Sequence, residues 1–335
     1  MVSVYFRVDA DEKLGLGHLS RCRSLMLAFL NAFQCTFSID SADKGLVKRF
    51  IPNIDFDFYG SGRSHTGQHF DIAIVDVPEI AHKKKEHLGG ISDLIVCIDD
   101  EGPGLAYQDI LIRPNLLNLT KPLGTVISSD CYWSGRDYII LHPDFAVAAD
   151  QKKSQNKKVK ELLVCFGGSD QCGLTVRVIP VLRNLATDIK IHIVLGAAFR
   201  QDAEVASVLK GDPRFSVSRN LSNMAQHFRN ADVSLISGGT LLYEACSLGV
   251  PSVVVSQNEP QETESRICAA AGAVLSLGVN SSISDDELFA GLQRLIEDGS
   301  LRENMAKQGP GIVSPDGAGR IVSRLRSYIR KEAGQ

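Results

Sequence analysis

The stretch Val233-Ser-Leu-Ile-Ser-Gly-Gly-Thr-Leu-Leu-Tyr-Glu-Ala-Cys-Ser-Leu248 changes its hydrophobic pattern in the middle. Its first four residues form an apolar run typical of a buried strand, whereas the residues from Leu241 onward have helical spacing. The two glycines between them allow a tight turn. A strand that passes through a glycine turn directly into a helix is typical of the β-α units of a parallel sheet.

The same alternation of short apolar runs and helical patterns extends over the whole chain. In the first half, strands are predicted at 2–8, 36–39, 56–59, 72–77, 94–98 and 110–112, with helices at 18–33 and 80–88. In the second half, strands are predicted at 162–166, 191–195, 215–217, 233–236 and 252–255, with helices at 175–185, 224–228, 241–248, 285–307 and 320–330. Strands separated by helices imply parallel β-α-β units with helices on both faces of the sheet. We therefore predict an α/β protein with two Rossmann-like, doubly wound parallel sheets.

The length of 335 residues favours two domains, because one hydrophobic core seldom organises so long a chain. No hydrophobic residue stands between Ala149 and Val159, where the sequence reads Asp-Gln-Lys-Lys-Ser-Gln-Asn-Lys-Lys. Such a run is typical of a solvated linker. We predict an N-terminal domain at 1–150, a linker at 149–158 and a C-terminal nucleotide-binding domain at 158–335. Two open sheets that face each other would form an interdomain cleft, a common place for small-molecule binding.

Composition excludes several classes of partner. A hydrophobic share of 44% and a charged share of 22% are typical of a soluble globular protein, and a net charge of -3 gives no reason to expect nucleic acid. No apolar run is long enough to span a bilayer, and the N-terminus reads as a strand instead of a signal peptide. The eight cysteines lack C-x-x-C spacing. We expect reduced thiols, no metal site and a cytoplasmic location.

A candidate catalytic base follows the glycines of Gly15-Leu-Gly17. His18 begins a predicted helix whose apolar stripe consists of Leu19, Cys22, Met26, Phe29, Leu30 and Phe33. The partial positive charge of a helix N-terminus disfavours imidazolium, so we expect a neutral His18 that accepts a proton near pH 7. Arg21 lies one turn on, and a base beside a cation suits a substrate that carries phosphate. Alternatively, His18 only caps the helix and Arg21 is a solvated charge.

Three aspartates stand at the C-terminal ends of predicted strands, namely Asp76, Asp99 and Asp100. This edge is where open α/β sheets bind ligands, although aspartates also cap turns there.

Two glycine turns in the second half predict a nucleotide site. Phe166-Gly-Gly-Ser-Asp170 and Ser237-Gly-Gly-Thr240 both follow strands, and the free N–H groups of a helix start bind phosphate. Glu244 is the only charged residue between Asp232 and Glu259. A carboxylate in apolar surroundings usually has a partner, and the two hydroxyls of a ribose would serve. Alternatively, Glu244 points into solvent and favours the helix dipole.

An N-terminal dinucleotide site is the competing interpretation. Gly15-Leu-Gly17 is followed by Asp40 at the end of the next strand, about where a ribose-binding acid would stand. However, Ser20 occupies the third glycine position, and residues 9–14 separate the strand from the glycines. A dinucleotide fold turns into its helix at once, so this interpretation is disfavoured.

The motifs together resemble those of a known family. Arg7-x-Asp9, Gly15-x-Gly17-His18-x-x-Arg21, Ile98-Asp-Asp100, Phe166-Gly-Gly-Ser-Asp170 and Ser237-Gly-Gly-Thr-Leu-Leu-Tyr-Glu244 occur in the order found in the PseG/SpsG family, followed by Leu248-Gly-x-Pro251 and Gln261. The resemblance covers nearly the whole chain. It implies a GT-B fold, related to MurG-type glycosyltransferases, and hydrolysis of a nucleotide sugar in pseudaminic acid-type biosynthesis. It implies UDP as the nucleotide and neither metal nor redox cofactor.

The residue patterns and the resemblance together predict the site. His18 is the predicted catalytic base that activates water. The predicted substrate contacts are Arg7, Asp9, Gly17, Arg21, Asp76, Ser169 and Gln261, and the predicted nucleotide contacts are Gly168, Gly238, Gly239, Thr240 and Glu244.

Two positions depart from the family pattern near the sugar. Pro78 stands where the family usually has Tyr, and Pro260 stands where it commonly has Asn. The resemblance therefore implies a UDP-sugar, with an acetamido-deoxy sugar as the expected kind. Two other functions stay open from the sequence: a GT-B glycosyltransferase that uses a UDP-sugar donor, and a non-catalytic nucleotide-sugar-binding protein.

Overall fold

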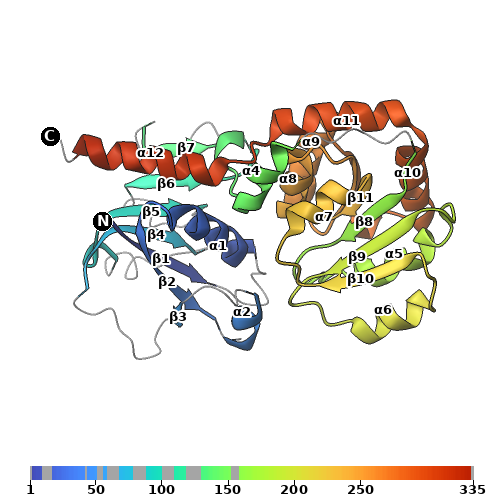
Figure 1. The fold of residues 1–335 in the computed structure, drawn as a ribbon, viewed down its shortest axis with the longest axis horizontal. Coiled ribbons are helices and arrows are strands. Elements are labelled where there is room, and N and C mark those ends of the chain that lie inside the picture. Colours follow the sequence, from blue (N-terminus) through green and yellow to red (C-terminus); the bar gives the residue numbers. More distant parts are fainter. Residues whose placement is uncertain are drawn as a thin grey trace. The chain divides into compact units, whose positions relative to one another are not determined.

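The chain forms two compact α/β units in a computed structural model that describes residues 2–9, 17–41, 44–50, 56–58, 68–77, 88–99, 109–117, 130–151 and 158–332. The first unit comprises Met1–Pro143 together with Asp316–Gln335, and the second comprises Asp144–Pro315 (Figure 1). Each unit contains one parallel sheet, as the alternation of strand and helix patterns predicts.

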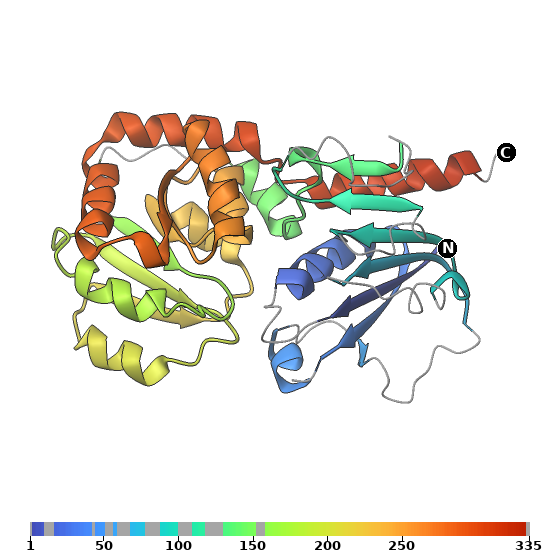
Figure 2. The ribbon, with the colours of Figure 1, turned by 180° about the vertical axis from the view of Figure 1, so that it is seen from behind.

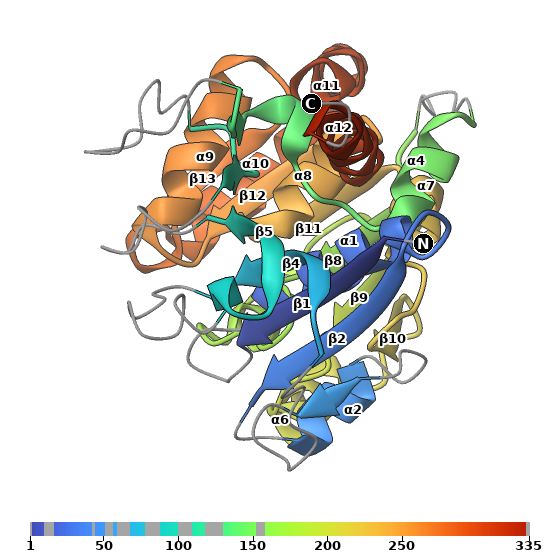
Figure 3. The same cartoon turned by 90° about the vertical axis from the view of Figure 1, so that its left-hand side faces the viewer.

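The first unit is built on a seven-stranded sheet with the order β3-β2-β1-β4-β5-β6-β7. Its strands are β1 (Ser3–Asp9), β2 (Gln34–Asp40), β3 (Asp57–Phe58), β4 (Phe70–Asp76), β5 (Ser92–Ile98), β6 (Ile110–Arg113) and β7 (Tyr132–Ser134). Figure 3 shows β2, β1, β4 and β5 side by side. Because all pairings are parallel, the residues that follow β4 and β5 meet at one edge of this sheet.

Among its described residues, the first unit has the helical segments α1 (Gly17–Phe29), α2 (Lys44–Phe50), the 3-10 turn η2 (Arg136–Tyr138) and α12 (Gly317–Glu332). Helix α1 packs its apolar stripe on the sheet, and the Phe29 ring meets Phe6 of β1 edge to face at 5.5 Å. One member of the predicted stripe is wrong: Leu30 is 50% exposed, because the helix ends at Phe29.

The second unit has a six-stranded sheet with the order β10-β9-β8-β11-β12-β13. Its strands are β8 (Glu161–Cys165), β9 (Lys190–Leu195), β10 (Phe215–Arg219), β11 (Val233–Ile236), β12 (Ser252–Ser256) and β13 (Leu275–Val279). Helix α4 (Pro143–Ala149) begins at the last residue of the first segment of unit one and continues into the second unit. The other helical segments of the second unit are α5 (Leu174–Leu182), α6 (Asp202–Leu209), α7 (Met224–Asn230), α8 (Thr240–Ser247), α9 (Glu259–Ala270), η3 (Asn280–Ser282), α10 (Asp285–Glu297) and α11 (Gly299–Ile312).

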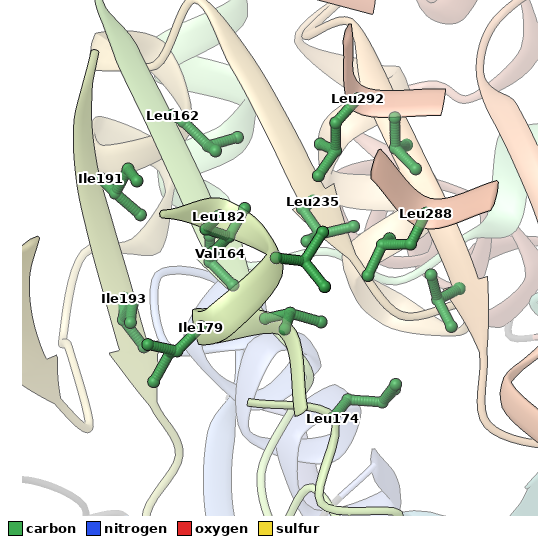
Figure 4. Packing of buried hydrophobic residues seen from close by; sticks show 14 of the residues in the cluster. Leu162, Val164, Leu174, Ile179, Leu182, Ile191, Ile193, Leu235, Leu288 and Leu292 are labelled. Carbon is green, nitrogen blue, oxygen red and sulfur yellow. The ribbon is translucent and has the colours of Figure 1, made fainter. Parts of the chain in front are cut away.

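Helices cover both faces of this second sheet. Leu162 and Val164 of β8 point into a core with Ile179 and Leu182 of α5, and Leu288 and Leu292 of α10 close the same core (Figure 4). The views from opposite sides show α7 on one face of the sheet and α5 on the other (Figures 1 and 2). Strands buried on both faces read as continuous apolar runs, which is why the sequence predicts them well.

The C-terminal helix belongs to the first unit, which differs from the predicted domain at 158–335. The guanidinium of Arg324 lies 4.7 Å from the centre of the Trp133 ring, and it also donates a hydrogen bond to the hydroxyl of Tyr138. A Cβ on Gly317 would lie 2.0 Å from the carbonyl oxygen of Ile139, so the backbone at the start of the helix packs directly on the backbone at Ile139. These are contacts between distant segments, which local patterns do not reveal.

Other differences from the sequence prediction have local causes. The single helix predicted at 285–307 is two helices, because the Asp298 carboxylate accepts from Leu301 N–H and starts α11. The sequence prediction lacks strands β7 and β13 and helices α2, α4, α6 and α9. The helix predicted at 80–88 and the linker predicted at 149–158 lie largely outside the described residues, as do Asp100 and Pro78.

Candidate active site

Four polar side chains, His18, Arg21, Asp76 and Asp99, gather at the carboxyl edge of the first sheet, and we call them the His18 cluster. Helix α1 supplies His18 and Arg21 one turn apart, β4 ends in Asp76, and Asp99 follows β5. Asp99 has a φ of 56°, in the left-handed region that aspartate tolerates better than most residues. Neighbouring parallel strands thus bring two of the three predicted edge aspartates to the candidate base.

Asp76 holds this cluster together. Its side chain is completely buried, whereas the side chain of His18 is 22% exposed. The Nδ1 atom of His18 lies 2.6 Å from Asp76 Oδ1. Arg21 donates from Nε to Asp76 Oδ2 at 2.5 Å and from Nη2 to Asp76 Oδ1 at 2.6 Å, so this ion pair has two parallel hydrogen bonds.

Arg21 links both aspartates. Its Nη1 donates to Asp99 Oδ2 at 3.0 Å, and Asn115 Nδ2 donates to the other oxygen of Asp99 at 3.4 Å. Burial alone would lower the pKa of Arg21, but the charges of Asp76 and Asp99 outweigh it and raise the pKa. Burial would likewise raise the pKa of Asp76, but the charge of Arg21 and the hydrogen bonds from Arg21 and His18 lower it. Asp76 is therefore ionised at neutral pH.

Arg7 and Asp9 form a separate pair at the end of β1. Arg7 is 5% exposed, and its Nη1 lies 2.6 Å from Asp9 Oδ1. Its Nη2 donates to Asp40 Oδ2 at 3.1 Å, and Nη1 donates to the Val8 carbonyl at 2.7 Å. The pair fixes the chain at the end of β1. The segment that follows, residues 10–16 with Gly15 among them, lies outside the described residues. A substrate contact by Arg7, Asp9 or Gly17 stays a prediction.

The two glycine turns predicted to bind nucleotide lie at the carboxyl edge of the second sheet. The turn at Gly167, Gly168 and Ser169 follows β8, and a Cβ on Gly196 after β9 would lie 2.2 Å from the Gly168 carbonyl oxygen. Only glycine permits this approach. Asp170 ends the turn as a buried cap of α5, because its carboxylate accepts from the N–H groups of Leu174 and Thr175.

The second turn runs from Ser237 to Thr240 and opens directly into α8. Gly239 has a φ of 77°, and a Cβ on Gly238 would lie 2.7 Å from Cβ of Gln261. Gln261 is thus brought to the turn, as predicted, but it lies in the first turn of α9 and not in a loop. Asn258 caps α9 by accepting from Gln261 N–H at 3.0 Å, a cap signal that the sequence contains.

Glu244 lies one turn into α8, partly exposed. Its Oε2 atom is buried and has no hydrogen-bond partner in the part of the chain that the structure describes. Burial raises the pKa of Glu244 from 4.5 to about 8. The position between apolar residues therefore leaves an acceptor open, as the isolated charge in the sequence suggests.

Sequence reasoning missed the residues that hold Gln261. Its Oε1 accepts from Gln257 N–H at 2.9 Å, and Gln257 Nε2 donates to the Phe166 carbonyl at 2.9 Å. Beneath them, the buried carboxylate of Glu262 accepts from Ser256, Ser276 and Arg266. No local sequence pattern indicates this network, because Ser256 and Ser276 stand twenty residues apart in the chain.

Among the residues placed by the structure, no three His, Cys, Asp or Glu side chains gather closely enough to hold a metal ion. No helix in the same part of the chain is long and apolar enough to cross a membrane.

Comparison with curated proteins finds a relative over nearly the full length. The chain is 31% identical to the spore coat polysaccharide biosynthesis protein SpsG of Bacillus subtilis, over 97% of this chain and 98% of that protein. An uncharacterized protein of Methanocaldococcus jannaschii is 27% identical over 76% of this chain and 55% of its own length. No family profile matches the chain.

Solved structures share the fold at low identity. The MurG structure from Acinetobacter baumannii matches with a TM-score of 0.65 and 15% identity, over 97% of this chain and 99% of that one. The complex of MnaA from S. aureus with UDP matches with a TM-score of 0.67 and 12% identity, over 98% and 97% of the two chains. The GT-B fold with two doubly wound sheets is thereby confirmed, and the predicted interdomain cleft stays a prediction.

Proposed function

Since this chain belongs to the SpsG family, we propose that it is an enzyme that hydrolyses a UDP-linked sugar to UDP and the free sugar. The name of the B. subtilis relative connects that protein with polysaccharide biosynthesis, and we infer that the sugar released here serves such a synthesis. The family resemblance favours an acetamido-deoxy sugar of the pseudaminic acid type.

The proposed reaction breaks the bond between the anomeric carbon and the phosphate oxygen. His18 takes a proton from water through Nε2, and the water oxygen forms a bond to the anomeric carbon. The electrons of the breaking bond leave with UDP. The N–H groups at Gly239 and Thr240 stabilise the charge that develops on the diphosphate, because they belong to the start of α8.

The observation that carries this proposal is the state of His18. Its imidazole is partly exposed, and its Nδ1 side faces a buried, ionised carboxylate at 2.6 Å. A base that is fixed on one side and open on the other is suited to proton abstraction. A histidine that only caps α1 would not need a buried aspartate behind it.

A panel of nucleotide sugars tests the proposal directly. The protein is incubated with UDP-sugars and with other nucleoside diphosphate sugars, and the products are separated by mass spectrometry. We expect UDP and a free sugar from at least one UDP-acetamido-deoxy sugar in water alone. Release that requires an added acceptor would identify a glycosyltransferase, and binding without any release would identify a non-catalytic binder.

Turnover is expected to survive removal of divalent cations. Helix-end amides hold a diphosphate without a metal ion, and the glycine turn at Gly238 and Gly239 supplies such amides at the start of α8. The measurement is the rate of UDP release after exhaustive chelation, compared with the rate in added magnesium or manganese. A loss of activity with chelator that either metal restores would contradict this expectation.

A further inference from the structure

All three guanidinium nitrogens of Arg21 donate hydrogen bonds to carboxylates. Two of its nitrogens donate to Asp76 and the third donates to Asp99, each at 3.0 Å or less. A contact of Arg21 to the substrate stays a prediction. In the structure the guanidinium holds Asp76, whose side chain is completely buried.

The Nδ1 atom of His18 has two neighbours that require opposite protonation. Asp76 Oδ1, at 2.6 Å, is an acceptor and requires a proton on Nδ1. Arg21 Nη2, at 2.9 Å, is a donor and requires a lone pair on Nδ1. In a neutral imidazole, the first arrangement leaves the lone pair on Nε2, and the second places the proton there.

Distance favours the first arrangement. Both contacts are charge-assisted, because Asp76 and Arg21 are both ionised, but the contact to Asp76 is the shorter one, at 2.6 Å against 2.9 Å. Arg21 also already donates from Nη2 to Asp76 Oδ1 at 2.6 Å. When His18 accepts a second proton during catalysis, Asp76 stabilises the imidazolium, whereas Arg21 repels it.

We propose that Asp76 is a positioning residue that keeps the proton of His18 on Nδ1 and the lone pair on Nε2, and that Arg21 holds Asp76 in place for this task. The inference rests on the proposed function, in which Nε2 of His18 takes the proton of water. Among the residues that the structure describes, the other charged and titratable groups near Asp76 are Arg21 and Cys22 from α1, and Asp99, which follows β5, lies beyond Arg21. Cys22 donates to Asp76 Oδ2 at 3.5 Å and leaves Oδ1 to His18 and Arg21.

Asp76→Asn is the first test. An amide accepts through one atom only, so it either presents N–H to His18 and forces the other tautomer, or accepts weakly as a neutral group. We expect kcat for UDP release to fall at least about a hundredfold while KM changes less than about threefold.

Asp93→Asn is the matched control. Asp93 Oδ1 lies 2.8 Å from His69 Nε2, and both side chains are more than half exposed. The same substitution in this surface His–Asp pair should leave kcat and KM for UDP release within about twofold of the wild-type values. An Asp76→Asn protein that folds and keeps more than a tenth of the wild-type kcat would overturn the proposal.

Nitrogen NMR of the wild-type protein tests the tautomer without a variant. With ¹⁵N-labelled histidine, the signals of His18 are assigned as those missing from His18→Asn. At a pH where the ring is neutral, we expect a protonated Nδ1 and an unprotonated Nε2. The reverse tautomer would overturn the proposal even if Asp76→Asn fails to fold. The proposed function fails separately, when the sugar panel shows no hydrolysis while the expected tautomer is observed.

Discussion

His18→Asn is expected to give a folded protein that binds UDP and turns over at least about a hundredfold more slowly than the wild type. The amide nitrogen of asparagine can take the place of Nδ1 and donate to Asp76, whose oxygen lies 2.6 Å from Nδ1 in the wild type. The variant thus keeps the buried hydrogen bond and loses only Nε2. Amide groups do not accept protons near neutral pH, so the general base is removed.

The measurements are kcat for UDP release and the dissociation constant for UDP by calorimetry. The affinity for UDP should stay within about threefold, because the predicted nucleotide contacts lie in the second unit. The control is His69→Asn, which makes the same change in the exposed pair with Asp93 and should keep wild-type turnover. More than about a tenth of wild-type turnover in His18→Asn would show that His18 is not the base.

The fold was predictable because its main signals are local. Strands such as β8, which read as apolar runs, and turns such as Gly238-Gly239, which open into α8, need no knowledge of distant residues. The failures concern contacts over long sequence distances. The C-terminal helix meets Trp133 and Tyr138 across almost two hundred residues, and its amphipathic pattern does not indicate which core it covers.

The sequence predicts that Asp76 and Arg21 contact substrate, since a charged residue at a sheet edge or a helix start suggests a ligand, and that role stays a prediction. The contact between the two side chains was not predicted. Their bidentate pairing depends on the order β1-β4-β5 of the folded sheet, which places Asp76 beside α1. Sequence alone gives no such register. The isolation of Glu244 among apolar residues is a local pattern that the sequence shows directly, and its contact with the nucleotide stays a prediction.

Glu244→Gln is expected to change nucleotide affinity and stability in opposite directions. In the proposed complex the carboxylate accepts hydrogen bonds from the ribose hydroxyls, and an amide oxygen accepts them more weakly. The affinity for UDP should fall about tenfold or more, a loss on the order of 1–3 kcal/mol. The ligand-free protein should become more stable near neutral pH, because the amide of glutamine cannot ionise, whereas the carboxyl group with its buried Oε2 atom can.

The direction of the stability change follows from the raised pKa of Glu244. In the unfolded chain the group ionises near its ordinary value of 4.5, whereas in the folded protein it ionises at about 8. Stability of the wild type should therefore decrease as pH rises from about 4.5 to about 8, and this dependence should be absent from Glu244→Gln. At pH 7 we expect the variant to be more stable by about 1–3 kcal/mol, since one pKa unit is worth about 1.4 kcal/mol and partial exposure reduces the full value.

Urea unfolding and UDP titration of both proteins at pH 5, 7 and 8.5 check this expectation. The titration of the UDP phosphate affects both proteins equally, so the difference between them at each pH reports Glu244 alone. The control is Glu303→Gln on the outer side of α11, an exposed carboxyl that should change neither quantity. A Glu244→Gln protein with unchanged UDP affinity and an unchanged pH dependence of stability would show that Glu244 is an ordinary surface carboxylate. Gln keeps the shape of the side chain. A gain in the stability of the ligand-free protein together with a loss of UDP affinity would therefore show that Glu244 contributes to nucleotide binding and lowers the stability of the ligand-free protein.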